Sequence, residues 1–361
     1  MSQPPGQRQQ RAVAELLRVA NVVEPLAARF DAAGEALAVV GGWVRDTLLG
    51  RQSDEDLDFA TSAHPDKTEQ LLDGWADTVW AIGREFGTIG ARKGDVRIEV
   101  TTYRSDTYAP DSRKPAVDFG DTLEGDLSRR DFTVNAMAVL LPARTFVDPY
   151  GGLDDLAAKV LRTPSTAEQS FSDDPLRMMR AARFAGLLGF EPVDDVVAAT
   201  RDMADRIAIV SAERVSDELT KLVCSPAPRR GLSFMVSTGL ADHVLPELPA
   251  LRLERDEHHR HKDVYEHTLT VLEQTIGLES RLPGGGPDLV ARLAALLHDI
   301  GKPRTRRFGP EGSVTFHHHD VVGAKLARRR LRALRFPNEV TDSVAQLVEL
   351  HLRFHGYGGG E

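Results

Sequence analysis

The chain has 361 residues, of which 41% are hydrophobic and 27% are charged, with a formal net charge of −9. This length predicts two or three ordered globular domains, and the acidic charge disfavours a protein that coats nucleic acid indiscriminately, without excluding one RNA bound on a local basic face. There is no apolar stretch long enough to cross a membrane and no signal peptide, and the lone Cys224 cannot form an internal disulfide, so we expect a cytoplasmic protein with no membrane partner.

The first informative stretch combines a glycine turn with two closely spaced acids. Ala36–Val40 is an apolar run that stops at a Gly-Gly pair, which predicts a buried strand, a turn and then a short helix. On the strand that follows, Asp56 and Asp58 flank Leu57, and the two-residue period of a strand places both carboxylates on one face. Two carboxylates side by side suit Mg²⁺, and a glycine turn before a helix start suits a phosphate group.

An Asp-x-Asp pair alone is common in surface loops, so the order of the parts carries the interpretation. Strand, glycine turn, helix and acidic strand together resemble the nucleotidyltransferase superfamily that includes DNA polymerase beta. More closely, Gly-Gly-Trp-Val-Arg-Asp at 41–46 and Asp-Leu-Asp-Phe-Ala-Thr at 56–61 resemble the class II tRNA nucleotidyltransferase and bacterial poly(A) polymerase family. The resemblance implies that Asp56 and Asp58 hold two Mg²⁺ ions. It also implies triphosphate contacts at Gly42, Arg45 and Arg130.

The segment after residue 60 predicts the remainder of an α+β head with a mixed sheet. A short helix to Trp75 is followed by strands over 78–82, 87–92 and 96–102, the last two as a hairpin. Glu99 lies inside the last strand, where an acid needs a ligand or solvent, and a plain exposed Glu is the alternative. Its surroundings resemble the family strand that carries the third catalytic carboxylate, so the resemblance implies that Glu99 helps position the metals or the attacking hydroxyl.

Residues 106–126 are rich in Pro, Gly and Asp and predict a long loop, which in the family is flexible and influences nucleotide choice. The string Leu127–Ala136 follows and resembles the family's second motif. By that resemblance Arg130 contacts the nucleotide and Asp131 is a candidate for recognising the ribose, whereas a salt bridge at a helix start is the alternative. A strand over 145–147 closes the head, which we expect to end near Arg162.

From residue 163 onward the chain is expected to be helical, and one helix carries acid and arginine at every third position. Asp174 and the arginines 177, 180 and 183 would share one face, from which a carboxylate and a guanidinium can hydrogen-bond the edge of a base. An N-cap at Asp174 before Pro175 is the alternative, and both roles could coexist. The family carries a Glu-Asp-x-x-Arg motif here as a protein template for CTP or ATP, with Asp173 replacing the Glu in this chain. The resemblance implies template roles for Asp174 and Arg177, and nucleotide or phosphate contacts for Arg180 and Arg183.

A second candidate metal site begins after a polar histidine run at 258, 259 and 261 that we expect to face solvent. His298 and Asp299 are adjacent, with Gly301 and Pro303 ending their helix, and imidazoles from neighbouring helices would suit a divalent metal. The order resembles the HD phosphohydrolase superfamily, and a degenerate structural copy is the alternative. The candidate ligands of this second divalent metal are His267, His298 and Asp299. The resemblance also implies a late Asp on a further helix, so we expect that helix to be absent or the chain to be shortened.

These observations predict a nucleotidyltransferase head over 1–162, a helical neck and RNA-binding body over 163–253, and an HD-like helical domain over 254–361. The resemblance implies an enzyme that adds or repairs the 3′-terminal CCA of tRNA from CTP and ATP, with release of pyrophosphate and with no DNA partner. A poly(A) polymerase, or an HD phosphohydrolase whose head only binds RNA or nucleotide, are the alternatives.

Overall fold

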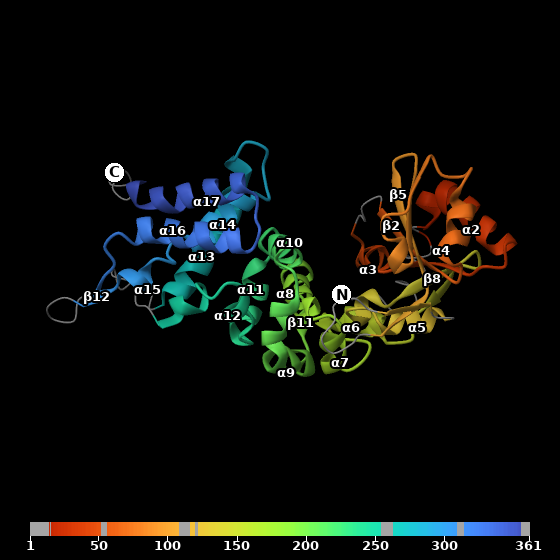
Figure 1. Cartoon of the computed structure of the whole chain (residues 1–361), viewed down its shortest axis with the longest axis horizontal. Helices are drawn as coiled ribbons and strands as arrows, with labels where there is room; N and C mark the ends of the chain where they lie inside the picture. Colours follow the sequence, from red (N-terminus) through yellow and green to blue (C-terminus); the bar gives the residue numbers. More distant parts are fainter. Residues whose placement is uncertain are drawn as a thin grey trace. The chain divides into compact units, whose positions relative to one another are not determined.

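The computed structural model describes residues 14, 16–51, 56–107, 116–119, 122–253, 263–308 and 314–354. By its internal contacts the chain divides into two compact units. The first comprises Met1–Asp174 and Glu191–Val196, and the second Pro175–Phe190 and Val197–Glu361 (Figure 1). Within the described residues, no helix is long and apolar enough to cross a membrane.

A seven-stranded mixed sheet forms the centre of the first unit, with the strand order β3-β4-β5-β2-β1-β8-β9. Strands β2 and β5 run parallel, whereas the other neighbours in the sheet are antiparallel. This confirms the predicted α+β head. The strands are β1 (Leu37–Val40), β2 (Asp56–Thr61), β3 (Thr78–Trp80), β4 (Thr88–Lys93), β5 (Val96–Thr102), β8 (Ala138–Leu141) and β9 (Thr145–Val147).

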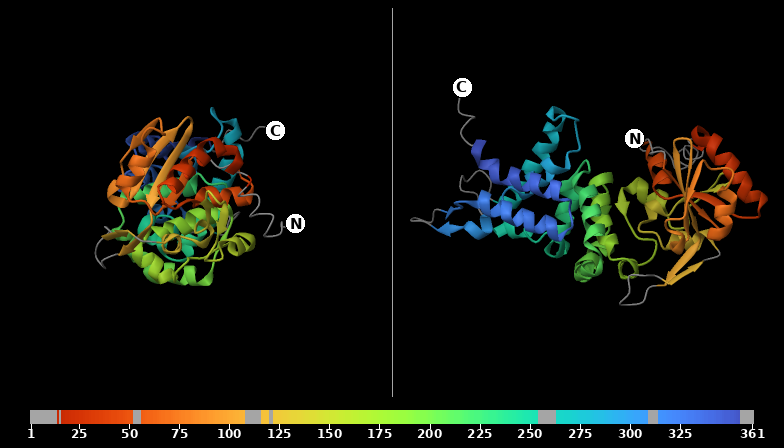
Figure 2. Two further views of the ribbon diagram at one scale, coloured as in Figure 1. Left: turned by 90° about the vertical axis from the view of Figure 1, so that its right-hand side faces the viewer. Right: turned by 45° about the horizontal axis from the view of Figure 1, so that its top comes forward.

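Helices of the first unit lie beside this sheet (Figure 2). They are η1 (Leu16–Val19), α2 (Ala20–Ala32), α3 (Gly42–Leu49), α4 (Pro65–Leu72), η2 (Arg84–Phe86), α5 (Leu123–Ser128), η3 (Thr133–Asn135), α6 (Gly152–Ala158) and α7 (Ala167–Asp173). Part of the predicted 106–126 loop pairs as an antiparallel ladder, β6 (Arg104–Thr107) with β7 (Ala116–Phe119). A short parallel ladder joins β10 (Val160–Leu161) to β11 (Glu191–Pro192).

The register of β2 follows from its apolar residues. Leu57 and Phe59 are each 1% exposed and anchor one face of the strand in the core, so Asp56 and Asp58 must lie on the opposite, exposed face. A shift of one residue would bury both acids and expose both apolar side chains. The core thus determines on which side of the sheet the carboxylates stand.

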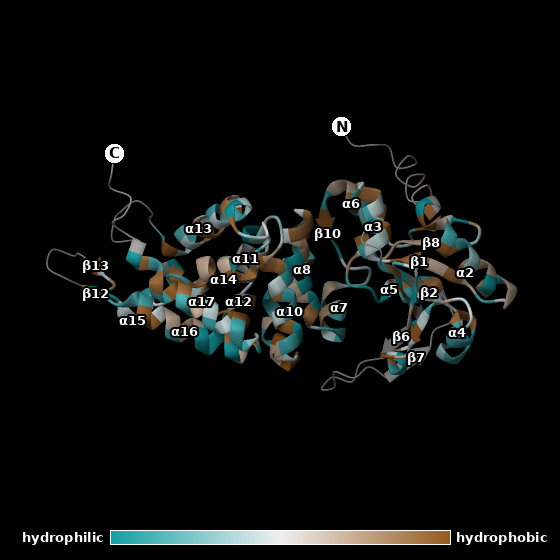
Figure 3. Ribbon diagram, turned by 90° about the horizontal axis from the view of Figure 1, so that it is seen from above, coloured by the Kyte–Doolittle hydropathy of each residue, from teal (hydrophilic) through white to brown (hydrophobic). Residues whose placement is uncertain are grey.

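The second unit is helical, as predicted, and its ribbons carry both hydrophilic and hydrophobic segments, as amphipathic helices do (Figure 3). Its elements begin with α8 (Leu176–Leu188), α9 (Asp194–Met203, whose start to Val196 belongs to the first unit), η4 (Ala204–Ile209), α10 (Ala212–Val223), α11 (Pro228–Ser237), α12 (Leu240–Val244) and η5 (Pro249–Leu253). They continue with α13 (Val264–Leu278), η6 (Glu279–Arg281), α14 (Leu289–Leu297), α15 (Lys302–Thr305), α16 (His319–Ala333), α17 (Asn338–Leu350) and η8 (His351–Phe354). One short hairpin, β12 (Arg307–Phe308) with β13 (Val314–Thr315), precedes α16.

Two local expectations differ from the structure. Asp174 is the C-cap of α7, and Pro175 occupies the N-cap position of α8, so Asp174 does not cap the arginine-bearing helix. Helix α14 ends at Leu297, before the expected stop. Gly301 and Pro303 instead lie at the start of the next short helix, α15. The histidines at 258, 259 and 261 lie outside the described residues.

Candidate functional site

Three carboxylates meet at the parallel pair of strands in the middle of the head sheet. In the β2–β5 register, Asp58 lies directly opposite Glu99, and Asp56 lies opposite Arg97. These side chains and Leu57 line a hollow of about 270 Å³. The structure therefore brings together the predicted catalytic acids Asp56, Asp58 and Glu99, from strands that are separated by about forty residues in the sequence.

The three carboxylates around this hollow differ in how far nearby arginines compensate their negative charge. Arg97 donates to Glu99 at 3.0 Å across the exposed face. The pKa of Asp58 is raised, because the walls around its carboxylate withdraw water and because Glu99 and Asp56 repel its negative charge, while Arg130 and Arg97 act in the opposite direction. A carboxylate that is costly to ionise beside two other acids gains stability from a bound cation. This donor set of hard oxygens fits Mg²⁺.

The glycine turn after β1 lies against the same carboxylates. Gly41 has a φ of +75°, a conformation that L side chains rarely adopt. A Cβ built there would lie 3.1 Å from Nη1 of Arg130 and 3.7 Å from Oδ2 of Asp58. The turn thus lets the backbone approach both Arg130 and Asp58, and the predicted approach to a phosphate group stays a prediction.

Arg130 is held in place by an acid that the sequence interpretation did not single out. The carboxylate of Asp126, at the end of the 106–126 stretch, is fully buried and accepts from Arg129 at 2.6 Å and from Arg130 at 3.1 Å. Burial alone would raise the pKa of Asp126, but the charges of Arg130 and Arg129 outweigh it and hold the pKa below its ordinary value. A carboxylate four residues before Arg130 was the only local signal for this ion pair.

Arg45 and Asp131 belong to a buried network behind the turn. Arg45 donates through Nη1 to Asn135 Oδ1 at 2.6 Å and through Nη2 to Asp46 at 2.7 Å. Asn135 in turn donates to Asp131 at 2.9 Å, and the backbone N–H of Phe132 donates to the same carboxylate oxygen. Arg45 and Asp131 are 6% and 7% exposed, so both side chains are buried and are linked to each other through Asn135. Asn135 is the member that sequence reasoning missed.

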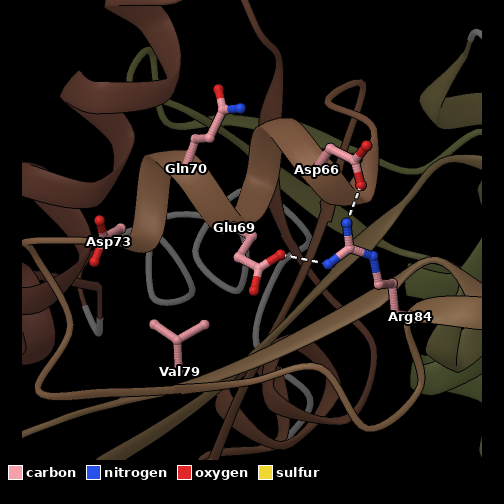
Figure 4. Close-up of a pocket in the computed structure, with 6 residues that line it drawn as sticks. All are labelled: Asp66, Glu69, Gln70, Asp73, Val79 and Arg84. Carbon is pink, nitrogen blue, oxygen red and sulfur yellow. Dashed lines mark hydrogen bonds and ion pairs between the residues drawn. The ribbon is translucent and has the colours of Figure 1, made fainter.

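A second acidic hollow in the head contains acids that pair with an arginine. Asp66, Glu69 and Asp73 come from α4 and its end, and they line a space of about 480 Å³ together with Gln70, Val79 and Arg84 (Figure 4). The guanidinium of Arg84 pairs with both Asp66 and Glu69 across an exposed surface. Two of the three acids in this hollow therefore share one guanidinium as their ion-pair partner.

The arginines of α8 lie in the second unit, whereas Asp174 belongs to the first. Arg177 is buried, with 8% exposure. Arg183 donates to Glu218 of α10 at 2.6 Å, and Arg180 pairs with the same carboxylate at 3.5 Å. Glu218 is 2% exposed and orients two of the three arginines, although nothing in its local sequence singles it out.

The HD-like part contains one buried carboxylate surrounded by imidazoles. Asp299, 2% exposed, follows His298 at the end of α14. Its Oδ2 lies 3.1 Å from Nε2 of His298 and 3.9 Å from Nε2 of His267, which α13 supplies. These are the three candidate ligands named from the sequence, and they come together as one group whose ligand atoms lie within 4.8 Å of one another.

Two further histidines face the other oxygen of the same carboxylate. Nε2 of His319, at the start of α16, lies 3.3 Å from Asp299 Oδ1, and Nε2 of His351, at the start of η8, lies 3.9 Å from it. Asp299, His319 and His351 form a second group of possible metal ligands within the described residues. The sequence gave no means of selecting His319 from the histidines at 317 and 318. It also gave no sign that His351 lies near Asp299.

The protonation of this cluster is set by burial and by the shared acid. Burial would raise the pKa of Asp299, but His298, His319 and Lys302 hold it well below its ordinary value. Burial lowers the pKa of His351 to about 4, so its imidazole is neutral at pH 7. His319 has a raised pKa despite its burial, because hydrogen bonds to Asp299 and to the Phe316 carbonyl favour its charged form.

Comparison with known families divides the chain into three matched segments. Residues 37–162 match the family described as poly A polymerase head domain. Residues 189–251 match a probable RNA and SrmB-binding site of polymerase A, and residues 264–358 match the HD domain.

Individual relatives extend these matches. The A-adding tRNA nucleotidyltransferase of Deinococcus radiodurans is 38% identical over 321 residues, which are 87% of this chain and 68% of that protein. The CCA-adding enzyme of Streptococcus sanguinis is 39% identical over 234 residues, and the match spans 64% of this chain but only 57% of that enzyme's length. Among solved structures, the CCA-adding enzyme of Bacillus stearothermophilus in complex with CTP is similar, with a TM-score of 0.62, 28% identity, and coverage of 97% of this chain and 71% of that chain.

Proposed function

The chain belongs to the tRNA nucleotidyltransferase family, and from this premise we propose that it adds or repairs the 3′-terminal CCA of tRNA, using CTP and ATP and releasing pyrophosphate. The observation that carries the proposal is the placement of Asp56, Asp58 and Glu99 side by side on the exposed face of β2 and β5. The negative charges of these three side chains repel one another, and bound cations would relieve that repulsion. The glycine turn beside them is where we propose that a phosphate group binds.

Two Mg²⁺ ions are proposed as the cofactors of this site, held by Asp56 and Asp58 with Glu99 completing the carboxylate set. When bound, the ions supply a lowered pKa for the terminal 3′-hydroxyl of the RNA and stabilisation of charge on the triphosphate and the departing pyrophosphate. The raised pKa of Asp58 supports this assignment, because a cation would relieve the repulsion from Glu99 and Asp56.

The residues around the turn are proposed to bind the nucleotide. Gly42 begins α3, where free backbone N–H groups can meet phosphate oxygens, and Arg130 provides a guanidinium beside Gly41. Contacts from Arg45 to the triphosphate and from Asp131 to the ribose remain predictions, and in this structure both side chains are engaged with Asn135.

Selection of the base is proposed for Asp174 and Arg177, with Arg180 and Arg183 as supporting nucleotide or phosphate contacts. A carboxylate accepts from an exocyclic amine, which cytosine and adenine both carry, and a guanidinium donates to a ring nitrogen or a carbonyl oxygen. Glu218 would hold the last two arginines in the correct orientation. We propose that the helical body recognises the RNA by backbone and shape.

The test offers CTP, ATP or both to tRNA ending before, within and after CCA, and sizes the products. We expect addition of the missing nucleotides followed by arrest. Replacing Asp56 and Asp58 together by Ala should lower incorporation by roughly three orders of magnitude, equivalent to about 4 kcal/mol of transition-state stabilisation. Asp66→Asn, in the locally paired acidic hollow, is the matched control and should retain activity. Incorporation that survives the double replacement would contradict the proposal.

The same products separate the nearest alternatives. Addition of A alone to tRNA ending in CC is the second candidate, favoured by the name of the Deinococcus relative that matches 87% of the chain. Long A tails would instead indicate a poly(A) polymerase.

For the HD-like part we propose a divalent-metal site made by His267, His298 and Asp299, with accessory hydrolysis of phosphate esters as its activity. The convergence of these side chains on one buried carboxylate supports it. Replacing His298 by Gln should remove any phosphatase or phosphodiesterase activity and leave incorporation into tRNA largely intact. A loss of incorporation in a folded variant would contradict this separation of the two activities.

A further inference from the structure

Trp80 lies on the same face of the head sheet as the three carboxylates. Trp80 of β3 pairs with Gly90 of β4, and Gly90 pairs with Glu99 of β5. Glu99 in turn lies opposite Asp58 of β2. Residues that lie opposite one another on neighbouring strands point to the same side of a sheet. One row across the sheet therefore leads from an indole, over a glycine, to two of the predicted catalytic acids.

The indole of Trp80 lies directly on the backbone of Gly90. A Cβ built at Gly90 would lie 2.0 Å from Nε1 of the indole and 2.2 Å from Cε2, so any side chain at this position would displace the ring. A glycine inside a strand often marks a place where another group approaches the backbone closely. Here the glycine allows the ring to extend from the edge strand β3 over β4, toward the strand that carries Glu99.

Two exposed arginines share this face with Trp80. Arg92 and Arg97 lie opposite each other in the next row, and Arg97 lies opposite Asp56. The guanidinium carbon of Arg97 is 5.6 Å from the centre of the Trp80 ring, and Arg97 also donates to Glu99 at 3.0 Å. Proteins bind single-stranded nucleic acid with this combination of groups, because an aromatic ring stacks on a base while cations attract the phosphates.

Trp80 differs in exposure from the other two tryptophans of the chain. Trp43 and Trp75 are 7% and 8% exposed, whereas Trp80 is only partly buried. Part of its indole is therefore open to solvent, and a base stacked there would bury apolar surface of both partners.

The position of Trp80 in the strand order indicates which substrate the ring contacts. The order β3-β4-β5-β2-β1 places Trp80 on one flank of the carboxylates and the glycine turn after β1 on the other. The nucleotide triphosphate is proposed to bind at that turn, beside Gly41 and Arg130. In a transfer assisted by two metal ions, the attacking and leaving oxygens are in line on opposite sides of the phosphorus. The acceptor hydroxyl must therefore approach from the flank that carries Trp80.

We propose that Trp80 stacks on the base of the 3′-terminal nucleoside of the acceptor RNA, with Arg92 and Arg97 beside the phosphates that precede it. The inference rests on the proposed transfer to RNA, and it adds the residues that hold the acceptor end. Stacking tolerates different bases, because every base has a flat aromatic face. The same ring therefore accepts the terminal nucleoside at each stage of addition.

The binding test uses the full chain, a tRNA ending in CC, and the same tRNA with the base removed from its terminal nucleoside. The intact tRNA should quench the tryptophan fluorescence more than the abasic one, and Trp80→Phe should remove this difference. Trp80→Ala should weaken binding of the intact tRNA roughly tenfold and leave binding of the abasic tRNA unchanged. Trp80→Phe, which keeps a flat ring, should retain most of the affinity.

The transfer assay gives a second measurement. Trp80→Ala should raise the KM for tRNA roughly tenfold and leave the KM for ATP unchanged. Ile82→Ala is the matched control, because it removes an apolar side chain that is 87% exposed two residues further along the chain. This control should change neither KM.

Equal quenching by the two RNAs, or full affinity of Trp80→Ala for the intact tRNA, would overturn the proposal and leave Trp80 as a cover for Gly90. Quenching by CTP or ATP alone that is lost in Trp80→Phe would also overturn it, because the ring would then hold the incoming nucleotide. Binding as expected without any transfer would instead contradict the proposed function and support the stacking. Circular dichroism checks that Trp80→Ala is folded, and if it is not, the two RNAs and Trp80→Phe still decide.

Discussion

The head and the HD-like part each collect metal-ligand side chains, but they handle negative charge in opposite ways. In the head, Asp56, Asp58 and Glu99 stand on an exposed strand face with more acids than nearby cations. In the HD-like part, Asp299 is almost fully buried and is surrounded by imidazoles and by Lys302. A cluster on an open strand face still has partial access to water, although burial raises the pKa of Asp58, whereas a fully buried carboxylate must be compensated within the protein.

This difference has a functional meaning. A site that must exchange metal ions and nucleotides in every turnover benefits from an open face of hard oxygens. A site that retains its ions benefits from burial and from imidazoles whose orientation is fixed by backbone carbonyls. The two clusters should therefore respond differently to the same chemical change.

The largest expected contrast comes from neutralising one acid in each cluster of the metal-free protein. Asp299→Asn should lower the free energy of unfolding by about 3 kcal/mol, because it leaves Lys302 and the imidazoles around a buried, uncharged amide. Asp58→Asn should instead raise the unfolding midpoint, since the raised pKa of Asp58 means that its ionised carboxylate is less favourable in the folded head than in the unfolded chain. Urea unfolding in the presence of a chelator measures both. Equal destabilisation by the two replacements would break the comparison.

A smaller effect is expected at Asp126. This buried carboxylate is paired with Arg129 and Arg130, and it thereby holds Arg130 in place beside the exposed acids of the head. Asp126→Asn should destabilise the protein by about 2 kcal/mol, the typical worth of hydrogen bonds to a charged group. It should also weaken nucleotide binding, because Arg130 loses its buried partner. The affinity for CTP, measured by titration calorimetry, tests the second effect.

The pH dependence of the Asp126 contribution follows from its lowered pKa. A carboxylate whose folded-state pKa lies below the ordinary value of 3.8 stabilises the fold above that pH and loses this contribution as the pH falls through the folded-state pKa. The difference in stability between the unaltered chain and Asp126→Asn should therefore be constant near neutral pH and shrink below about pH 4. A difference that stays constant down to about pH 3 would contradict the assignment.

The smallest expected effect concerns the glycine turn. Gly41 and Gly34 both have a φ of +75°, but a Cβ on Gly34 meets nothing within 4 Å, whereas one on Gly41 meets Arg130 and Asp58. Each Gly→Ala replacement should cost about 1 kcal/mol from backbone strain. Only Gly41→Ala should also lower kcat/KM for the nucleotide, by about tenfold. Equal kinetics for the two variants would show that the close approach at Gly41 has no role in nucleotide binding.

Local periodicity was sufficient to predict the strand that carries the acids Asp56 and Asp58. Alternation of Leu57 and Phe59 with Asp56 and Asp58 is a property of neighbouring residues, so it could be read without knowing the sheet. The helix that leads to His298 and Asp299 was expected as well, although α14 ends at Leu297, before the predicted stop at Gly301 and Pro303. In contrast, Asp126, Asn135 and Glu218 were missed, because their partners are chosen by packing and their residue types are common on ordinary surfaces.

The sequence by itself determined which chemical groups the two parts contain and which faces of their strands and helices those groups occupy, since a strand or helix imposes its own period. Only the tertiary structure decided which of them meet. The parallel β2–β5 pairing placed Glu99 opposite Asp58, and the approach of α16 at Gly301 selected His319 from three consecutive histidines. Such contacts join distant segments through backbone pairing and side-chain volume, which no local pattern encodes.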